Sequence, residues 1–247
     1  MDKEKIIEEL DRFLGKNDYS AAREHLLLWL SRAEEAGDEP ASLLLLNELM
    51  GLCRKLGEKD NAVFYATTAL NKVRQMNIEQ NVGAATTYLN SATVYKAFGE
   101  AEKALPLYER AREIYERSLP ENDERLSGLY NNMALALVDL SRFREAEELY
   151  IKAIKILKFS SGKEPEQAIT YLNLASATEA ELGLIGGEEK ITEYINKARE
   201  LMNIGATRTD GGYAFVCEKC APVFGYYGYF LDEQELAARA RRIYEGS

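Results

Sequence analysis

The sequence has few of the residues that several protein classes need. Its 247 residues include five prolines, 17 glycines, three cysteines and one histidine. So little proline and glycine excludes a collagen-like fibre and argues against a loop-rich β protein. An odd number of cysteines with one close pair does not fit the disulfide framework of a secreted protein. A single histidine leaves hydrolytic triads and metal dyads without support.

Long apolar runs are also missing. Runs such as those at residues 26–30 and 43–46 are far short of the roughly 20 residues that a membrane helix requires. The N-terminus, MDKEKIIEELDRF, is charged throughout and lacks the apolar stretch of a signal peptide. These features predict a cytoplasmic protein that does not bind membranes.

The charge balance is acidic. Lys and Arg number 31 and Asp and Glu 41, which gives a net charge of −10. Because nucleic-acid binding depends on cations that neutralise phosphates, we expect no nucleic-acid partner. Hydrophobic residues make up 46% and charged residues 29%, a globular balance that excludes disorder as the main state.

An internal repeat is the strongest pattern in the chain. The segments LLLLNELMGLCRKLG, TTYLNSATVYKAFG, LYNNMALALVDLS and ITYLNLASATEAELG share one order of aromatic, amide and small residues. Their aligned asparagines are 43, 42 and 41 residues apart along the chain: Asn47, Asn90, Asn132 and Asn173. Chance does not readily keep one polar residue at the same phase of an apolar pattern four times.

Each repeat contains two amphipathic helices, because apolar residues recur at steps of three and four. Small residues such as Ala134, Ala146 and Ala153 lie at the predicted helix crossings, where they allow a close approach of the two axes. Gly57, Gly99 and the segment 182–190 mark turns, and the last of these predicts a longer turn than the others.

These features resemble the tetratricopeptide repeat family, in its longer, kinesin-light-chain-like form. The closest stretches are YLNSATVYKAFGEAEKALPLYERAREIY and YNNMALALVDLSRFREAEELYIKAIKIL. The resemblance implies an all-α, right-handed α-α superhelix of about six helical hairpins. We expect residues 1–247 to form one domain, with approximate repeats at 1–37, 38–78, 79–120, 121–161, 162–206 and 207–247.

In that family, the first helix of each hairpin lines the concave surface, and asparagines there bind extended peptides. An asparagine amide offers an acceptor and two donors, so a column of amides can bond the peptide groups of a ligand. The alternative is that each amide bonds a neighbouring helix and only sets the angle between repeats. The predicted peptide-binding residues are Asn47, Asn90, Asn131, Asn132, Asn173, Arg54 and Lys96.

The remaining inner wall follows from the same alignment. It is predicted to be mixed apolar and polar, and to consist of Leu43, Leu46, Met50, Thr86, Leu89, Thr93, Leu135, Asp139, Ile169, Leu172, Ser176 and Glu179 together with Asn131, Arg54 and Lys96.

Candidate catalytic groups are better explained by packing. Cys217 and Cys220 form a C-x-x-C pair, but both fall on the predicted packing face, where thiols act as small hydrophobes. His25 lies on an amphipathic helix without a partner at an informative spacing. We therefore expect no catalytic residue, no metal site and no cofactor, and we predict that the chain is not an enzyme.

The leading hypothesis is a scaffold whose concave groove binds a peptide or a segment of a partner protein. The alternative is a peptide-sensing regulator that resembles the pheromone receptors of Gram-positive bacteria but lacks their DNA-binding domain. The aromatic residues at positions 224–230 are expected to form the core of the last repeat, together with a cap or a face through which a homodimer forms. The alternative is an exposed docking site for a partner.

Overall fold

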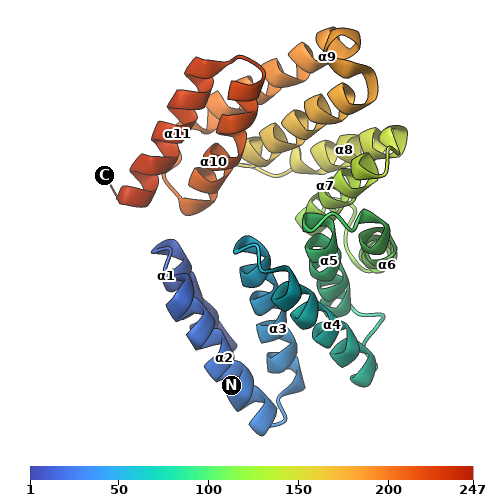
Figure 1. Ribbon diagram of the computed structural model, residues 1–247, viewed down its shortest axis with the longest axis vertical. Coiled ribbons are helices and arrows are strands. Elements are labelled where there is room, and N and C mark those ends of the chain that lie inside the picture. The colour runs from blue at the N-terminus through green and yellow to red at the C-terminus, as the bar shows by residue number, and fades with distance from the viewer. Residues whose placement is uncertain (247) are drawn as a thin grey trace. The chain divides into compact units, whose positions relative to one another are not determined.

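The computed structural model describes residues 1–246, and most of them are helical (Figure 1). No strand occurs among these residues, so the predicted all-α class is confirmed. No helix in the same part of the chain is both long and apolar enough to cross a membrane. The helices are α1 (Lys3–Gly15), α2 (Tyr19–Glu35), α3 (Glu39–Lys55), α4 (Lys59–Gln75), α5 (Val82–Ala97), α6 (Ala101–Ser118), α7 (Glu124–Asp139), α8 (Phe143–Leu157), α9 (Glu164–Ile204), the short 3₁₀ helix η1 (Gly205–Thr207), α10 (Gly211–Tyr226) and α11 (Phe230–Glu245).

The helices form two compact units, which divide between Leu119 and Pro120. The first unit contains the hairpins α1–α2, α3–α4 and α5–α6. The second contains α7–α8, a hairpin made by the two halves of α9, and α10–α11. One helix pair thus lies within each of the six predicted repeats.

Helix starts follow a simple sequence rule. Gly37 ends the turn after α2 with a φ of +65°, and the next residue, Asp38, caps α3 by accepting a hydrogen bond from the Ala41 N–H at 3.0 Å. Glycine tolerates this left-handed conformation, and a carboxylate satisfies a helix N–H that has no partner within the helix. Five more helices begin with a capping Asp or Asn, namely Asp2, Asp18, Asn81, Asp123 and Asp210.

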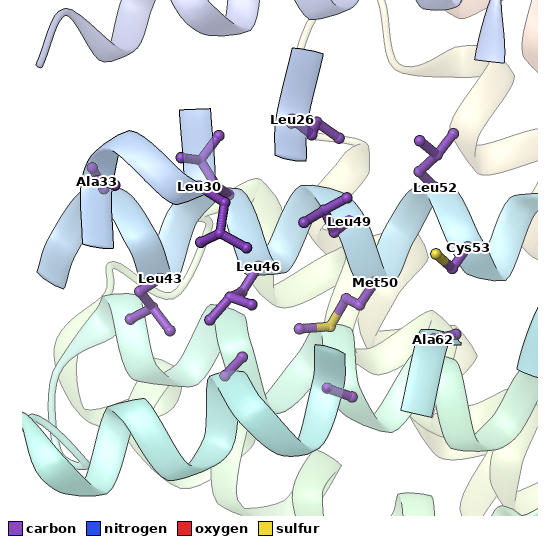
Figure 2. Packing of buried hydrophobic residues seen from close by; sticks show 14 of the residues in the cluster. Leu26, Leu30, Ala33, Leu43, Leu46, Leu49, Met50, Leu52, Cys53 and Ala62 are labelled. Atoms are coloured by element: carbon purple, nitrogen blue, oxygen red, sulfur yellow. The ribbon is translucent and has the colours of Figure 1, made fainter. Parts of the chain in front are cut away.

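The core of the first unit lies between neighbouring helices. Figure 2 shows Leu26 and Leu30 of α2 beside Leu49 and Leu46 of α3, all of them buried. The opposite side of α3 carries Met50, whose sulfur accepts a hydrogen bond from Ser91 of α5. Helix α3 is therefore covered by helices on more than one side.

Small residues occupy the helix crossings, as the repeat pattern predicts. Ala134 of α7 and Ala146 and Ala153 of α8 are completely buried, as are Ala92 and Ala104 in the first unit. A methyl group at these positions lets two backbones approach closely while the larger neighbours fill the space beside them.

The fifth hairpin differs from the prediction of a long turn. Helical geometry continues through residues 182–190, and only Gly183 leaves it, with φ of 72° and ψ of 168°. Glycine alone adopts this region readily. Gly187 then packs close to the first half of α9, because a Cβ there would lie 3.0 Å from the Thr178 methyl group. The predicted longer turn is wrong, because one glycine reverses the chain and a second permits close packing.

Removal of the hydroxyl group is expected to change the stability of the protein in opposite directions at two buried tyrosines. The Tyr150 hydroxyl is buried without a hydrogen-bond partner, whereas the Tyr213 hydroxyl donates to the Met202 carbonyl at 3.3 Å and accepts from Arg239 at 2.9 Å. We expect Tyr150→Phe to raise the free energy of unfolding by about 1 kcal/mol and Tyr213→Phe to lower it by about 1 kcal/mol. Urea unfolding of both variants measures the difference, and equal midpoints would contradict this packing.

Candidate functional site

The first helix of each central hairpin keeps one stripe of side chains accessible. Except for the adjacent pairs Asn47–Glu48 and Asn131–Asn132, successive stripe residues are three or four positions apart, so each stripe forms one broad face of its helix. They are Leu44, Asn47, Glu48 and Gly51 on α3; Gly83, Thr86, Asn90 and Thr93 on α5; Gly128, Asn131, Asn132 and Leu135 on α7; and Ile169, Asn173, Ser176 and Glu179 on α9. We call these stripes the open faces, and each predicted asparagine lies on one of them.

Four residues of the predicted inner wall are not accessible. Leu43, Leu46, Met50 and Leu172 are buried in the hydrophobic cores, so their assignment to the groove is wrong. The physical reason is that first helices are covered by neighbours on several sides, which leaves only a narrow face open. Leu89, Leu135, Asp139, Ile169, Ser176 and Glu179 remain at least partly accessible.

Two threonines of the same wall are engaged by the second helix of their own hairpin. The Thr86 hydroxyl lies 2.8 Å from the Tyr115 hydroxyl, and the Thr93 hydroxyl lies 3.1 Å from that of Tyr108. Both tyrosines are on α6 and are buried. These threonines therefore hold α5 against α6 as well as lying at the edge of the open face.

Asn47 and Asn90 form a hydrogen-bonded pair across the first unit. The Asn90 amide nitrogen donates to the Asn47 side-chain oxygen at 2.9 Å. The Asn47 nitrogen donates to the Leu43 carbonyl at 2.8 Å and to the Thr87 hydroxyl at 3.1 Å. Asn47 thus uses both of its donors and its acceptor within the protein, whereas the side-chain oxygen of Asn90 accepts no hydrogen bond from any described residue.

The second unit contains an equivalent pair in a shifted register. The Asn173 amide nitrogen donates to the side-chain oxygen of Asn131 at 2.9 Å. The sequence alignment pairs Asn173 with Asn132, one position further along. The structure therefore brings Asn131 and Asn173 together and leaves Asn132 out of this contact.

Asn132 keeps its whole amide available. Its side chain is half-buried on the open face of α7, and it makes no hydrogen bond within the part of the chain that the structure describes. Asn90, Asn131 and Asn173 each retain some unused donors or acceptors, because only one atom of each amide takes part in the pairs. The amides thus differ in the bonding capacity that they can offer a ligand.

The two predicted cationic residues lie near the ends of their helices. Arg54 is exposed in the last turn of α3, and Lys96 is half-buried in the last turn of α5. Neither is brought against an asparagine by a hydrogen bond that the structure records. A contact of Arg54 or Lys96 with a ligand remains a prediction.

A contact that the sequence did not suggest joins α9 to the end of α10. The hydroxyl groups of Tyr226 and Tyr227 donate to the two carboxylate oxygens of Glu179, at 2.5 and 2.7 Å. This carboxylate raises the pKa of Tyr226, and burial together with the carboxylate raises the pKa of Tyr227. The spacing of 47 and 48 residues exceeds the regular repeat, so alignment of the repeats gave no signal for it.

The cysteine pair is part of the core, as predicted. Cys217 and Cys220 are fully buried in the second unit, and burial raises the pKa of both thiols. Nucleophilic thiols require the opposite shift, because the thiolate is the reactive form. No group of His, Cys, Asp or Glu within residues 1–246 has the arrangement of a metal site.

His25 packs between two aromatic rings of the first hairpin. Its ring lies edge-on to Phe13 and Trp29, and its Nε2 is 2.9 Å from the Ile6 carbonyl oxygen. These contacts join α1 to α2, so His25 has a packing role in the first hairpin.

Comparison with known proteins supports the repeat assignment. Residues 83–158 match the model of the tetratricopeptide repeat family. No curated protein matches the chain in sequence.

Solved structures share the fold at low sequence identity. A kinesin light chain from Podospora anserina with nearly identical TPR-like repeats has a TM-score of 0.57 and 19% identity, over 81% of this chain and 94% of that chain. BtubC (BKLC) from P. vanneervenii has a TM-score of 0.58 and 19% identity, over 100% of this chain and 92% of that chain. A Rap protein in complex with competence and sporulation factor has a TM-score of 0.56 and 14% identity, over 96% of this chain and 73% of that chain.

Together, the hairpins, the matched repeats and these neighbours confirm the predicted resemblance. The chain has the fold of the kinesin-light-chain-like tetratricopeptide repeat proteins.

Proposed function

We propose that this chain is a non-enzymatic scaffold whose open faces bind an extended peptide or a segment of a partner protein. The observation that supports this most strongly is the uneven use of the asparagines. Asn47 is fully bonded within the protein, whereas Asn132 lies on an open face with all its donors and acceptors unused. Asparagine is disfavoured inside helices, so its presence there needs an explanation. Internal hydrogen bonds explain Asn47 but not Asn132.

The proposed chemistry is recognition of the ligand main chain. A half-buried amide can donate to a peptide carbonyl and accept from a peptide N–H, whatever side chains the ligand carries. Partly apolar neighbours such as Leu135 and Ile169 add contact area, and Arg54 and Lys96 supply cations near the helix ends. Specificity would then come from these flanking side chains.

The fold agrees with a binding role, because repeat proteins of this kind generally act as scaffolds. In this proposal, residues 1–247 form one domain that has no catalytic residue, cofactor or metal. The protein is cytoplasmic, and it binds a protein or a peptide.

The first test is binding to an array of extended peptides. For the peptides that wild type selects, we expect Asn132→Ala to weaken binding about tenfold without lowering stability, because this side chain makes no internal hydrogen bond. Asn47→Ala should lower the free energy of unfolding by about 1–3 kcal/mol, since it removes hydrogen bonds to Leu43 on α3 and to Thr87 and Asn90 on α5.

Asn71→Ala is the matched control, because Asn71 is an exposed asparagine on the second helix α4. It should change neither property. Full affinity of a folded Asn90→Ala/Asn132→Ala variant for every selected peptide would refute peptide binding by the open faces and leave the amides a purely structural role.

A second candidate is a peptide-sensing regulator. The observation that favours it is the shared fold with the Rap protein that was crystallised with competence and sporulation factor. A sensor of this kind would close around a short peptide and change its partner. Small-angle scattering with a selected peptide tests this: compaction supports a sensor, and an unchanged radius of gyration supports a rigid scaffold.

A further inference from the structure

Two neighbouring turns of the second unit expose large apolar side chains. The α9 turn carries Leu182, Leu184 and Ile185, and Ile185 is 92% exposed. The α10–α11 turn carries Tyr226, Phe230 and Leu231, and Leu231 is 82% exposed. We call these six residues the turn patch. Large apolar side chains that are exposed on two turns of one unit indicate a candidate interaction surface.

A cavity joins the two turns. It has a volume of about 390 Å³, and its walls include Leu184 and Ile185 from one turn and Tyr227 and Tyr229 from the other. Ile191 and Ile195 line the same cavity and belong to the core, where they are buried. An aliphatic side chain from outside could therefore enter between the turns and contact the core.

Carboxylates surround this apolar surface. Glu181, Glu188 and Glu189 are exposed beside the α9 turn, and none of them pairs with a cation in the described part of the chain. Within residues 1–246, the Glu179 carboxylate accepts hydrogen bonds from the two tyrosine hydroxyls alone. Two cations of this unit, Lys190 and Arg199, are already engaged, because Lys190 pairs with Glu147 and Arg199 pairs with Asp232. The rim of the turn patch is thus strongly negative.

We propose that the turn patch docks a cationic amphipathic helix of a partner protein. Leucine or isoleucine side chains on one face of that helix would fill the cavity, and flanking lysines or arginines would pair with Glu188 and Glu189. The charge decides against a second copy of this chain, since a symmetric contact would bring the two negative rims together. This surface is separate from the amides of the open faces and does not depend on them.

The probe is a synthetic helical peptide of about 16 residues with leucines on one face and lysines on the other. A matched peptide replaces each lysine by glutamate. We expect the cationic peptide alone to bind, and its affinity to fall about tenfold in Ile185→Ser and in Glu188→Lys/Glu189→Lys. Higher salt should weaken binding, because exposed charges are screened.

The controls separate this surface from others. Phe64→Ser removes an exposed aromatic side chain from α4 in the first unit, outside both the turn patch and the open faces. This variant should bind the cationic peptide as wild type does. Since Ile185, Glu188 and Glu189 are exposed, their variants should keep the wild-type circular dichroism spectrum.

Three results would overturn the proposal. They are equal binding of the anionic peptide, unchanged affinity in both patch variants, and sedimentation of wild type as a dimer that Ile185→Ser dissociates. The last result would assign the turn patch to self-association, the homodimer contact considered for the C-terminal repeat.

Discussion

Ala134→Glu is expected to unfold the second unit at temperatures where the wild type is fully folded. The Ala134 side chain is completely buried in α7 at a helix crossing, so a carboxylate there would lose its hydration without gaining a partner. The effective penalty for burying an unpaired charge is several kcal/mol. A domain has only about 5–15 kcal/mol of stability in total, so this is the largest effect that we predict for a single substitution.

Asn132→Glu is the control for that variant. It places the same carboxylate on the same helix, two positions earlier, on the open face where water can reach it. Circular dichroism during heating should show a large loss of thermal stability for Ala134→Glu and little change for Asn132→Glu. Equal melting temperatures for Ala134→Glu and wild type would show that the helix phase described here is incorrect.

Gly183→Ala is expected to destabilise the α9 hairpin by about 1–3 kcal/mol, because residues other than glycine pay that cost in this region of backbone conformation. Gly183 has φ of 72° and ψ of 168°, and it alone reverses a segment that is otherwise helical. The halves of α9 pack through Ala168, Leu172, Ile191 and Ile195. Strain at the turn would therefore also weaken this core.

Gly186→Ala, three residues later in the chain, is expected to have the opposite effect on stability. A Cβ at Gly186 would lie 3.6 Å from the Leu182 Cβ, an ordinary contact. Since alanine is favoured over glycine within helices, Gly186→Ala should be neutral or stabilise by up to about 1 kcal/mol. Urea unfolding should thus move the two midpoints in opposite directions, and a shared direction would contradict the turn geometry.

Much of the fold could be predicted because the same pattern of small and apolar residues recurs in successive repeats. Ala134, Ala146 and Ala153 recur at the positions where helices cross, and all three are buried. The α9 turn was harder to predict, because several glycines lie in residues 182–190 and only one of them leaves the helix. A composition rich in glycine indicates a turn but does not give its length.

The candidate site could be predicted to the level of the helix face but not of the single side chain. Asn131 and Asn132 differ by one position, which is about 100° around the helix, and only the former reaches Asn173. Met50 and Leu172 were expected in the groove because a periodic pattern identifies an apolar face, whereas burial depends on how many helices surround it. Contacts between repeats determine which asparagine is paired and which apolar residues are buried. The sequence of a single repeat does not specify these contacts.

The most direct test is photo-crosslinking of a peptide that the wild-type protein selects from the array. A crosslinker placed at position 132 on α7 is compared with one placed at position 148 on α8, an exposed site on the second helix of the same hairpin. The account predicts a peptide adduct from position 132 and none from position 148. An adduct from position 148 alone would contradict the claim that the first helices hold the partner.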